Sequence, residues 1–357
     1  MKRLDLRAPS TYVPLLLLAL ALAAPAVLPP LVVPFGYSAA FVRDILVNVC
    51  IFALLGVSWN ILGGYAGQLS LGHAAYFGIG AYTSTLLLVK AGVPTVAGLF
   101  LGGLMAMLVS IFIGLASFRL RGPYFAIATI ATAETLRLLA LKFSGLTYGA
   151  MGTTIPFKGN DPIDLQFTDK VSYYYVGLAL LLVAVAVTAY VARSRLGYYL
   201  VAVGQDEDAA EAVGIRAPRV KQQANFISAF FTGLAGTLSV QYTYFIEPES
   251  VFGLQVSVNA VLVAIVGGVG TLWGPVIGAL LLTPLSSTIQ ASLGNSFPGA
   301  QLIVYALVMI AVILFRPSGL VGLLAPAYRR FLSALPGAGL DRRRVQKAEE
   351  ARRASPA

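Results

Sequence analysis

Apolar runs of about 20 residues recur along the whole chain, with short polar or glycine-rich intervals between them. Runs of this length match the thickness of a hydrocarbon core, and they are too long and too evenly apolar for the strands of a membrane barrel. We therefore predict an all-α integral membrane protein with a bundle of about ten transmembrane helices. The expected spans are 12–33, 41–62, 63–89, 95–118, 123–141, 172–192, 225–245, 253–266, 275–289 and 300–315.

The longest polar interval before the C-terminal tail is 193–221, where basic residues frame the acidic cluster Asp206, Glu207, Asp208 and Glu211. The apolar positions of 201–215 predict one short helix with an apolar face, which Gly214 would end, with Pro218 just beyond. Such a helix either lies on lipid headgroups or docks into a groove of a partner. Its acidic residues suit an anionic membrane surface badly, which favours docking.

A second unusual stretch is 63–89, where glycines recur together with Gln68, Ser70 and His73. Two interpretations stay open. The stretch is either a broken helix beside a transport pathway, to which these three residues offer polar groups, or a tight helix contact with a loop at the membrane surface. His73 alone fits a packing histidine better than a ligand. A similar glycine-rich turn at 267–274, again beside a tryptophan, hints at a weak internal repeat.

One predicted span carries two charges, Glu134 and Arg137, which lie three residues apart and so share one helix face. They are either a pair facing a pathway or an intrahelical pair near the outer end of the span, and the second interpretation is favoured. Together with His73 they also motivate a competing hypothesis, an ion-coupled secondary transporter with a charge relay.

Composition narrows the class further. Hydrophobic residues make up 58% of the 357 residues and charged residues 11%, whereas a soluble domain carries roughly 25% charge. The net charge of +10 comes from cations in short loops and at the ends of the chain. Cations in these positions set the orientation of a membrane protein, so we predict no nucleic-acid partner. A single cysteine, Cys50, and a single histidine leave no basis for a disulfide or a metal site, and no cofactor is expected.

Orientation follows from these cations. With the N-terminus inside and ten spans, four basic segments fall on the cytoplasmic side: 2–7, 119–121, 193–221 and the tail. Both termini would then be cytoplasmic. We predict a permease domain over 1–316, with its cytoplasmic loop at 193–221, and a basic, partly disordered tail over 317–357. The first run is expected to be retained, although a cleaved signal peptide is the alternative.

The sequence shows none of the common catalytic motifs that were considered. The sequence contains no GxxxxGK[ST] phosphate-binding loop, no HExxH and no nucleophile elbow. We therefore expect a transport subunit that is not an enzyme and is driven by an ATPase on another chain.

Four stretches carry a family resemblance: GQLSLGHAAYFGIGAYTS, DAAEAVGIRAPRVK, FISAFFTGLAGTL and AIVGGVGTLWGPVIGA. Together they resemble the permease subunits of ABC importers for branched-chain amino acids, the LivM family, over most of 40–317. The resemblance implies that the loop helix is a coupling helix that docks into a cleft of the ATPase. The implied contact residues are Asp206, Ala210, Glu211, Ala212, Gly214 and Ile215.

The same resemblance implies a multi-pass protein of the bacterial inner membrane with four kinds of neighbour. These are a second homologous permease, two ATP-binding subunits, a periplasmic substrate-binding protein and the lipid membrane itself. The outer loop YGAMGTTIPFKG, residues 148–159, matches the family pattern only in part. Related permeases that carry urea or short amides therefore stay an alternative to Leu, Ile and Val.

Overall fold

The structure, a computed structural model, describes residues 9–293, 299–315 and 319–322. The chain forms two units, Met1–Val42 with Gly322–Ala357, and Arg43–Val321. The described part of the first unit holds the helix α1 (Pro9–Val32) and the 3-10 helix η1 (Val33–Phe35). Most of the predicted tail lies outside the described residues, so its order and its location stay predictions.

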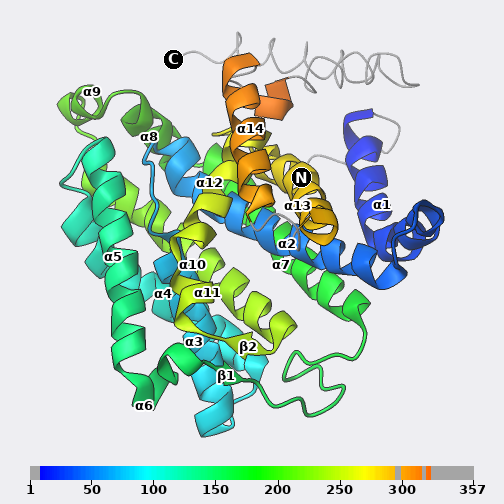
Figure 1. Ribbon diagram of the computed structural model, residues 1–357. Coiled ribbons are helices and arrows are strands. Elements are labelled where there is room, and N and C mark those ends of the chain that lie inside the picture. Colours follow the sequence, from blue (N-terminus) through cyan, green and yellow to red (C-terminus); the bar gives the residue numbers. More distant parts are fainter. Residues whose placement is uncertain (1–8, 294–298, 316–318, 323–357) are drawn as a thin grey trace. The chain divides into compact units, whose positions relative to one another are not determined.

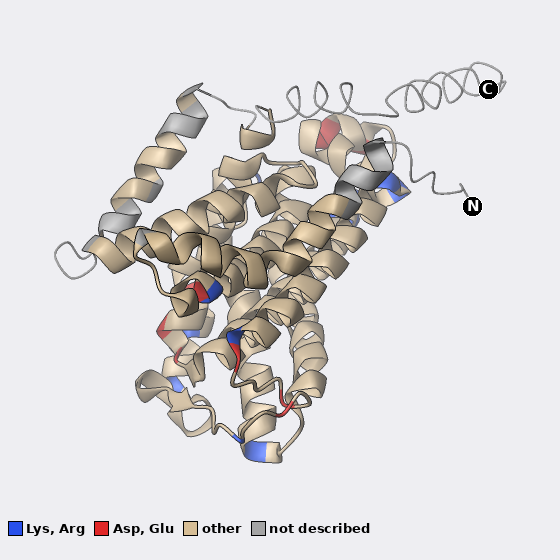
Figure 2. Cartoon of the chain, turned by 90° about the vertical axis from the view of Figure 1, so that its right-hand side faces the viewer, with Lys and Arg blue, Asp and Glu red and all other residues tan. Residues whose placement is uncertain are grey.

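Long helices dominate the second unit, as the apolar runs predicted. Their bounds are α2 (Ala39–Asn60), whose first residues belong to the first unit, α3 (His73–Ala91), α4 (Thr95–Ser117), α5 (Pro123–Lys142), α7 (Lys170–Arg193), α10 (Ala217–Thr243), α12 (Leu254–Gly267), α13 (Gly274–Leu293) and α14 (Ala300–Phe315). Figure 2 shows these helices mostly in tan, with few charged segments.

Among the described residues, five segments are long and apolar enough to cross a membrane. They are Ala39–Tyr65, Thr95–Ser117, Pro123–Lys142, Lys170–Arg193 and Pro248–Gly267. The prediction of a helical membrane protein is thus supported by its helices, while the count of about ten spans stays a prediction.

The helices α3, α4 and α10 pack tightly against one another in the middle of the second unit (Figure 1). Glycines make this possible. A Cβ atom at Gly80 in α3 would overlap the carbonyl oxygen of Gly233 in α10, and one at Gly102 in α4 would lie 2.7 Å from the carbonyl oxygen of Gly80. Small residues at helix contacts let backbones approach closely, and the resulting van der Waals packing is one of the forces that hold helices together inside a membrane.

Polar side chains of α10 add hydrogen bonds to the same contacts. Asn225 donates to the carbonyl of Ser110 in α4, Thr237 donates to the carbonyl of Gly80, and Gln241 donates to the hydroxyl of Thr95. All three α10 side chains are buried. Because buried polar groups are costly unless paired, these bonds fix how far α10 is rotated against its neighbours.

One end of the second unit is built from short elements: α6 (Ser144–Thr147), η3 (Gly149–Met151), β1 (Thr153–Thr154), β2 (Phe245–Ile246) and α11 (Pro248–Phe252) (Figure 1). β1 and β2 pair antiparallel, with Thr153 opposite Ile246 and Thr154 opposite Phe245. The loop that precedes α7 is thereby attached to the end of α10.

The charged pair of α5 lies near this same end. Arg137 binds Glu134 at 2.5 Å within the helix and Glu249 of α11 at 2.7 Å. The three charges therefore satisfy one another, as the favoured interpretation of an intrahelical pair predicted, with Glu249 as an additional partner.

The glycine-rich stretch after α2 is a break between two helices. α2 continues into the π-helix η2 (Ile61–Tyr65), residues 66–72 form a non-helical segment, and α3 starts at His73. Trp59 is buried and donates from Nε1 to the carbonyl of Ser70 at 2.7 Å. This bond folds the segment back onto the helix that precedes it.

The two glycine-rich turns lie side by side. Asn60 donates to the carbonyl of Thr271 at 2.9 Å and accepts from the backbone N–H of Gly270 at 2.8 Å. A Cβ atom at Gly64 would lie 2.7 Å from the nitrogen of Gly270, so the close approach needs glycine. The similarity of the two turns in sequence is thus matched by direct contact between them.

Candidate coupling surface

The polar interval 193–221 folds into two short helices, α8 (Arg195–Gln205) and α9 (Glu207–Ala212), at the end of the second unit opposite to β1 and β2 (Figure 1). The prediction of one helix over 201–215 was wrong, because the chain is extended at Asp206 (φ −154°, ψ 114°). The Asp206 side chain accepts from the backbone N–H of Ala209 at 3.0 Å and caps α9. Aspartate is among the preferred residues at that position, and its preference overrode the apolar pattern.

The helix α8 is amphipathic and packs onto the chain. Gly197, Leu200 and Val203 are buried at a spacing of three, while Tyr198 and Val201 are exposed. A Cβ atom at Gly204 would lie 2.9 Å from the carbonyl oxygen of Tyr65. α8 therefore lies directly against the glycine-rich stretch that follows α2.

The end of α9 is a Schellman motif. Gly214 has φ +91°, its N–H donates to the carbonyl of Glu211 at 2.9 Å, and the N–H of Ile215 donates to the carbonyl of Ala210 at 3.0 Å. Gly214 thus ends the helix as predicted. Pro218, expected only to lie beyond the helix end, stands in the first turn of α10, where its missing N–H has no cost.

Three cation–carboxylate contacts hold α9 on the chain. Lys221 of α10 binds Glu207 at 2.7 Å, and Arg121, between α4 and α5, binds Asp208 at 2.8 Å and lies 3.9 Å from Glu207. The Lys221 side chain is fully buried, whereas Arg121 and Asp208 are exposed. The hydrogen bond to Arg121 lowers the pKa of the Asp208 carboxyl, and that carboxylate raises the pKa of Arg121.

The outward face of α9 carries the residues that the sequence singled out. Asp206, Glu211, Ala212 and Gly214 are exposed, and Ile215 is half-buried. Ala210 is buried in an apolar cluster of the chain itself, with Leu200, Val203 and Ala217 among its members. Its side chain gives no support to the predicted partner contact, and it supports α9 from below.

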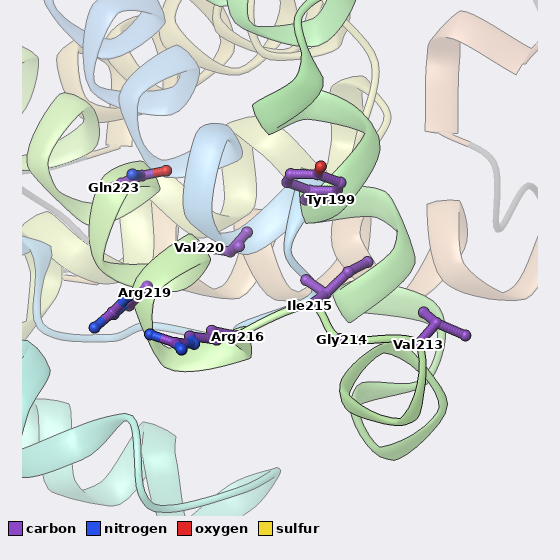
Figure 3. A pocket seen from close by; sticks show the side chains of 8 residues that line it. All are labelled: Tyr199, Val213, Gly214, Ile215, Arg216, Arg219, Val220 and Gln223. Carbon is purple, nitrogen blue, oxygen red and sulfur yellow. The ribbon is translucent and has the colours of Figure 1, made fainter.

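A surface pocket of about 480 Å³ opens beside the end of α9 (Figure 3). Arg216 and Arg219 stand on one side of it, and Tyr199 and Ile215 stand on another (Figure 3). The full lining is Tyr199, Val213, Gly214, Ile215, Arg216, Arg219, Val220 and Gln223. The pocket combines apolar walls with two guanidinium groups.

The predicted pathway residues lie away from this surface pocket and mostly inside the protein. Ser70 and His73 are buried, whereas Gln68 is partly exposed and donates to the carbonyl of Ala66 at 3.3 Å. The His73 ring lies 3.2 Å from the Ser70 hydroxyl and 2.8 Å from that of Ser228. Ser228 gives its single proton to the carbonyl of Ser58, so Nε2 of His73 is the donor toward Ser228.

Sequence reasoning missed Lys221 and Arg121 as the partners of α9. Lys221 was noted only as one of the cations that frame the acidic cluster, and Arg121 only as part of the basic segment 119–121. The available signal was a cluster of carboxylates with cations before and after it in the sequence, but charge alone does not say which cation is buried.

Comparison with known proteins identifies the family of the chain. Residues 41–313 match the family described as branched-chain amino acid transport system / permease component. The chain belongs to this family.

Two relatives illustrate the match. The high-affinity branched-chain amino acid transport system permease protein LivM of Escherichia coli is 30% identical over 82% of this chain and 72% of its own length. The corresponding protein LivH of Salmonella typhimurium is 26% identical over 76% of this chain and 91% of its own length. Among solved structures, PsaBC from Streptococcus pneumoniae in complex with Fab aligns with a TM-score of 0.43 and 12% identity, over 77% of this chain and 90% of that one.

Proposed function

We propose that the chain is the permease subunit of an ABC importer that moves Leu, Ile and Val, or closely related small amino acids, across the bacterial inner membrane. Membership of the permease family and the names of the relatives support the substrate class. ATP hydrolysis then takes place on separate subunits, and the chain itself is a transport subunit and no enzyme.

The observation that carries the mechanical part of the proposal is α9. It is a short, capped helix that stands on the surface and is tied to the chain by charged contacts. In the proposed complex it is the coupling helix, which an ATP-binding subunit contacts through Asp206, Glu211, Ala212, Gly214 and Ile215. Ala210 supports this surface from inside.

The proposed assembly contains a second homologous permease, two ATP-binding subunits and a periplasmic binding protein. The permease domain spans 1–316 with about ten membrane helices, and both termini and the 193–221 loop face the cytoplasm. Support for ten spans comes from the long helices α1, α2, α3, α4, α5, α7, α10, α12, α13 and α14.

Gln68, Ser70 and His73 remain the proposed polar residues of the transport path. In the present conformation Ser70 and His73 bond to each other inside the protein. Exposing them requires a rearrangement of residues 66–72, the non-helical segment that α8 contacts through Gly204. The coupling segment is therefore placed where its displacement changes this part of the chain.

The ion-coupled alternative gains no support from the described contacts. Arg137 binds Glu134 and Glu249, whereas His73 binds Ser70 and Ser228. The two groups share no residue, so the charges do not form the relay that this hypothesis needs.

The variant Glu211→Lys tests the proposal. Glu211 is exposed at the last turn of α9, and reversing its charge should lower leucine uptake and association with the ATP-binding subunits together, by about ten-fold each. Uptake is measured in proteoliposomes that hold the full transporter, with binding protein and ATP supplied, and association by co-purification.

The matched control is Glu247→Lys, beyond the far end of α10, which should leave ATPase association unchanged. Unchanged uptake together with intact association in Glu211→Lys would contradict the proposal. Parallel uptake assays with urea in place of leucine separate the amide alternative, which the partial match of loop 148–159 keeps in view.

A further inference from the structure

A fully buried lysine stands where α9 meets α10. The side chain of Lys221 has no exposed surface, and its ammonium group binds the Glu207 carboxylate at 2.7 Å. Glu207 itself is only 15% exposed. Ala217, Val220 and Ala224, neighbours of Lys221 on α10, belong to an apolar cluster. The pair therefore connects two elements through a low-dielectric region rather than through water.

The second attachment of α9 differs in kind. Arg121 and Asp208 are 55% and 75% exposed, so salt and water screen their attraction. This contact can break and re-form at little cost. The buried pair cannot, because separating it leaves an unpaired charge in an apolar setting.

A buried ion pair is a poor way to stabilise a fold. Apolar residues of similar volume often hold a protein at least as well, since they avoid the cost of desolvating two charges. What the ion pair adds is a penalty for separation, because moving α9 away from α10 would leave the buried Lys221 ammonium group without its partner. The presence of this pair therefore points to a requirement for a fixed position of α9.

We infer that the Lys221–Glu207 ion pair fixes α9 to α10, so that a displacement of the coupling helix moves α10 as one body with it. This inference rests on the proposed function. It makes Lys221 and Glu207 positioning residues for transport, distinct from the exposed residues that would contact the ATP-binding subunit.

The packing of α10 shows where such a movement goes. The helix has 27 residues, it is mostly buried against α3 and α4, and its polar side chains bond to both. A helix so firmly packed cannot bend locally without breaking these bonds. A movement of the N-terminal end of α10 is therefore transmitted to the centre of the second unit.

The double variant Lys221→Met with Glu207→Gln tests the inference. It removes both charges with little change of shape, so the chain should still fold, whereas Lys221→Met alone leaves the Glu207 carboxylate with only the exposed Arg121 at 3.9 Å. In the full chain in lipid nanodiscs, amide hydrogen exchange over 206–215 should become about ten-fold faster, with exchange in α10 unchanged. Arg219→Met, which removes an exposed cation two residues away, should leave exchange at wild-type rates.

The functional measurement is leucine taken up per ATP hydrolysed by the reconstituted transporter. In the double variant the ATP-binding subunits should still co-purify with the permease. The amount of leucine taken up per ATP hydrolysed should fall about ten-fold, because α9 is attached less firmly to α10. An unchanged ratio of leucine uptake to ATP hydrolysis would overturn the inference. A loss of folded protein alone gives this result, because it lowers uptake and hydrolysis equally. Unchanged exchange over 206–215 would also overturn the inference.

Failure of the proposed function is distinguishable from failure of this inference. If the wild-type chain neither binds ATP-binding subunits nor supports ATP-dependent uptake, the proposed function is wrong, whatever the exchange data show. If wild type transports and the double variant transports with the same uptake per ATP, only the inference fails.

Discussion

Single glycines determine how closely the central helices approach. Gly80 of α3 faces the carbonyl of Gly233 in α10, and Gly236 of α10 faces the carbonyl of Phe77 in α3. In each case a Cβ atom would overlap the backbone of the neighbouring helix. Since a backbone cannot adopt another rotamer, the two helices themselves would have to separate.

The substitution Gly80→Ala should therefore destabilise the protein by about 1–3 kcal/mol, the usual cost of overpacking a tight core. The free energy of unfolding in detergent, followed by circular dichroism, is the measurement. Gly145→Ala serves as the control, because Gly145 is exposed in α6 and has nothing within 4 Å of the added Cβ atom. A wild-type free energy for Gly80→Ala would mean that α3 and α10 pack less closely than described.

At the scale of the element, α9 is defined at both ends by local chemistry. Asp206 caps its start, and Gly214 with Ile215 closes its end in a Schellman motif. The helix has only six residues, too few to persist in water by itself. Its shape therefore depends on these two caps and on the ion pairs beneath it.

The substitution Gly214→Ala should weaken α9 by about 1 kcal/mol, since a side chain at positive φ is strained while the surrounding space is open. Gly214→Asn should cost less, because asparagine tolerates left-handed conformations better. Hydrogen exchange over 206–215 measures both. Equal exchange in Gly214→Ala and wild type would show that the left-handed turn does not limit the stability of α9.

The sequence predicted most helices but not how they contact one another. Length and hydrophobicity placed the runs of α2, α4, α5 and α7 within a few residues, because a membrane span is a constraint on composition. The break at Asp206 was missed, because a cap competes with an apolar pattern and a pattern alone cannot decide between them. The buried state of Lys221 was missed because it depends on contacts with residues distant in sequence.

At the scale of the whole molecule, the described second unit has two chemically different ends. One carries α8 and α9 with Arg121, Arg216 and Arg219 nearby, and the other carries the β1–β2 pair and the Glu134–Arg137–Glu249 group. The cluster of Lys and Arg residues at the α9 end supports the proposed cytoplasmic location of this end.

Cysteine labelling tests this orientation. The native Cys50 is buried, so it should react little with a charged maleimide. In right-side-out vesicles a membrane-impermeant reagent should label Asp161→Cys at once and Glu211→Cys only after permeabilisation. In inverted vesicles the order should reverse, and labelling of both positions from the same side would refute the proposed topology.

α10 is attached to other elements at both of its ends. Its first turns are bonded to α9, and the chain that follows its last turn is β2, which pairs with the outer loop through β1. This rod of 27 residues, about 40 Å long at 1.5 Å per residue, therefore joins the two ends of the second unit, which face the two sides of the membrane in the proposed topology. If α10 moves as proposed, binding of a partner at one end changes the binding free energy of a partner at the other end, and by linkage the effect is the same in both directions.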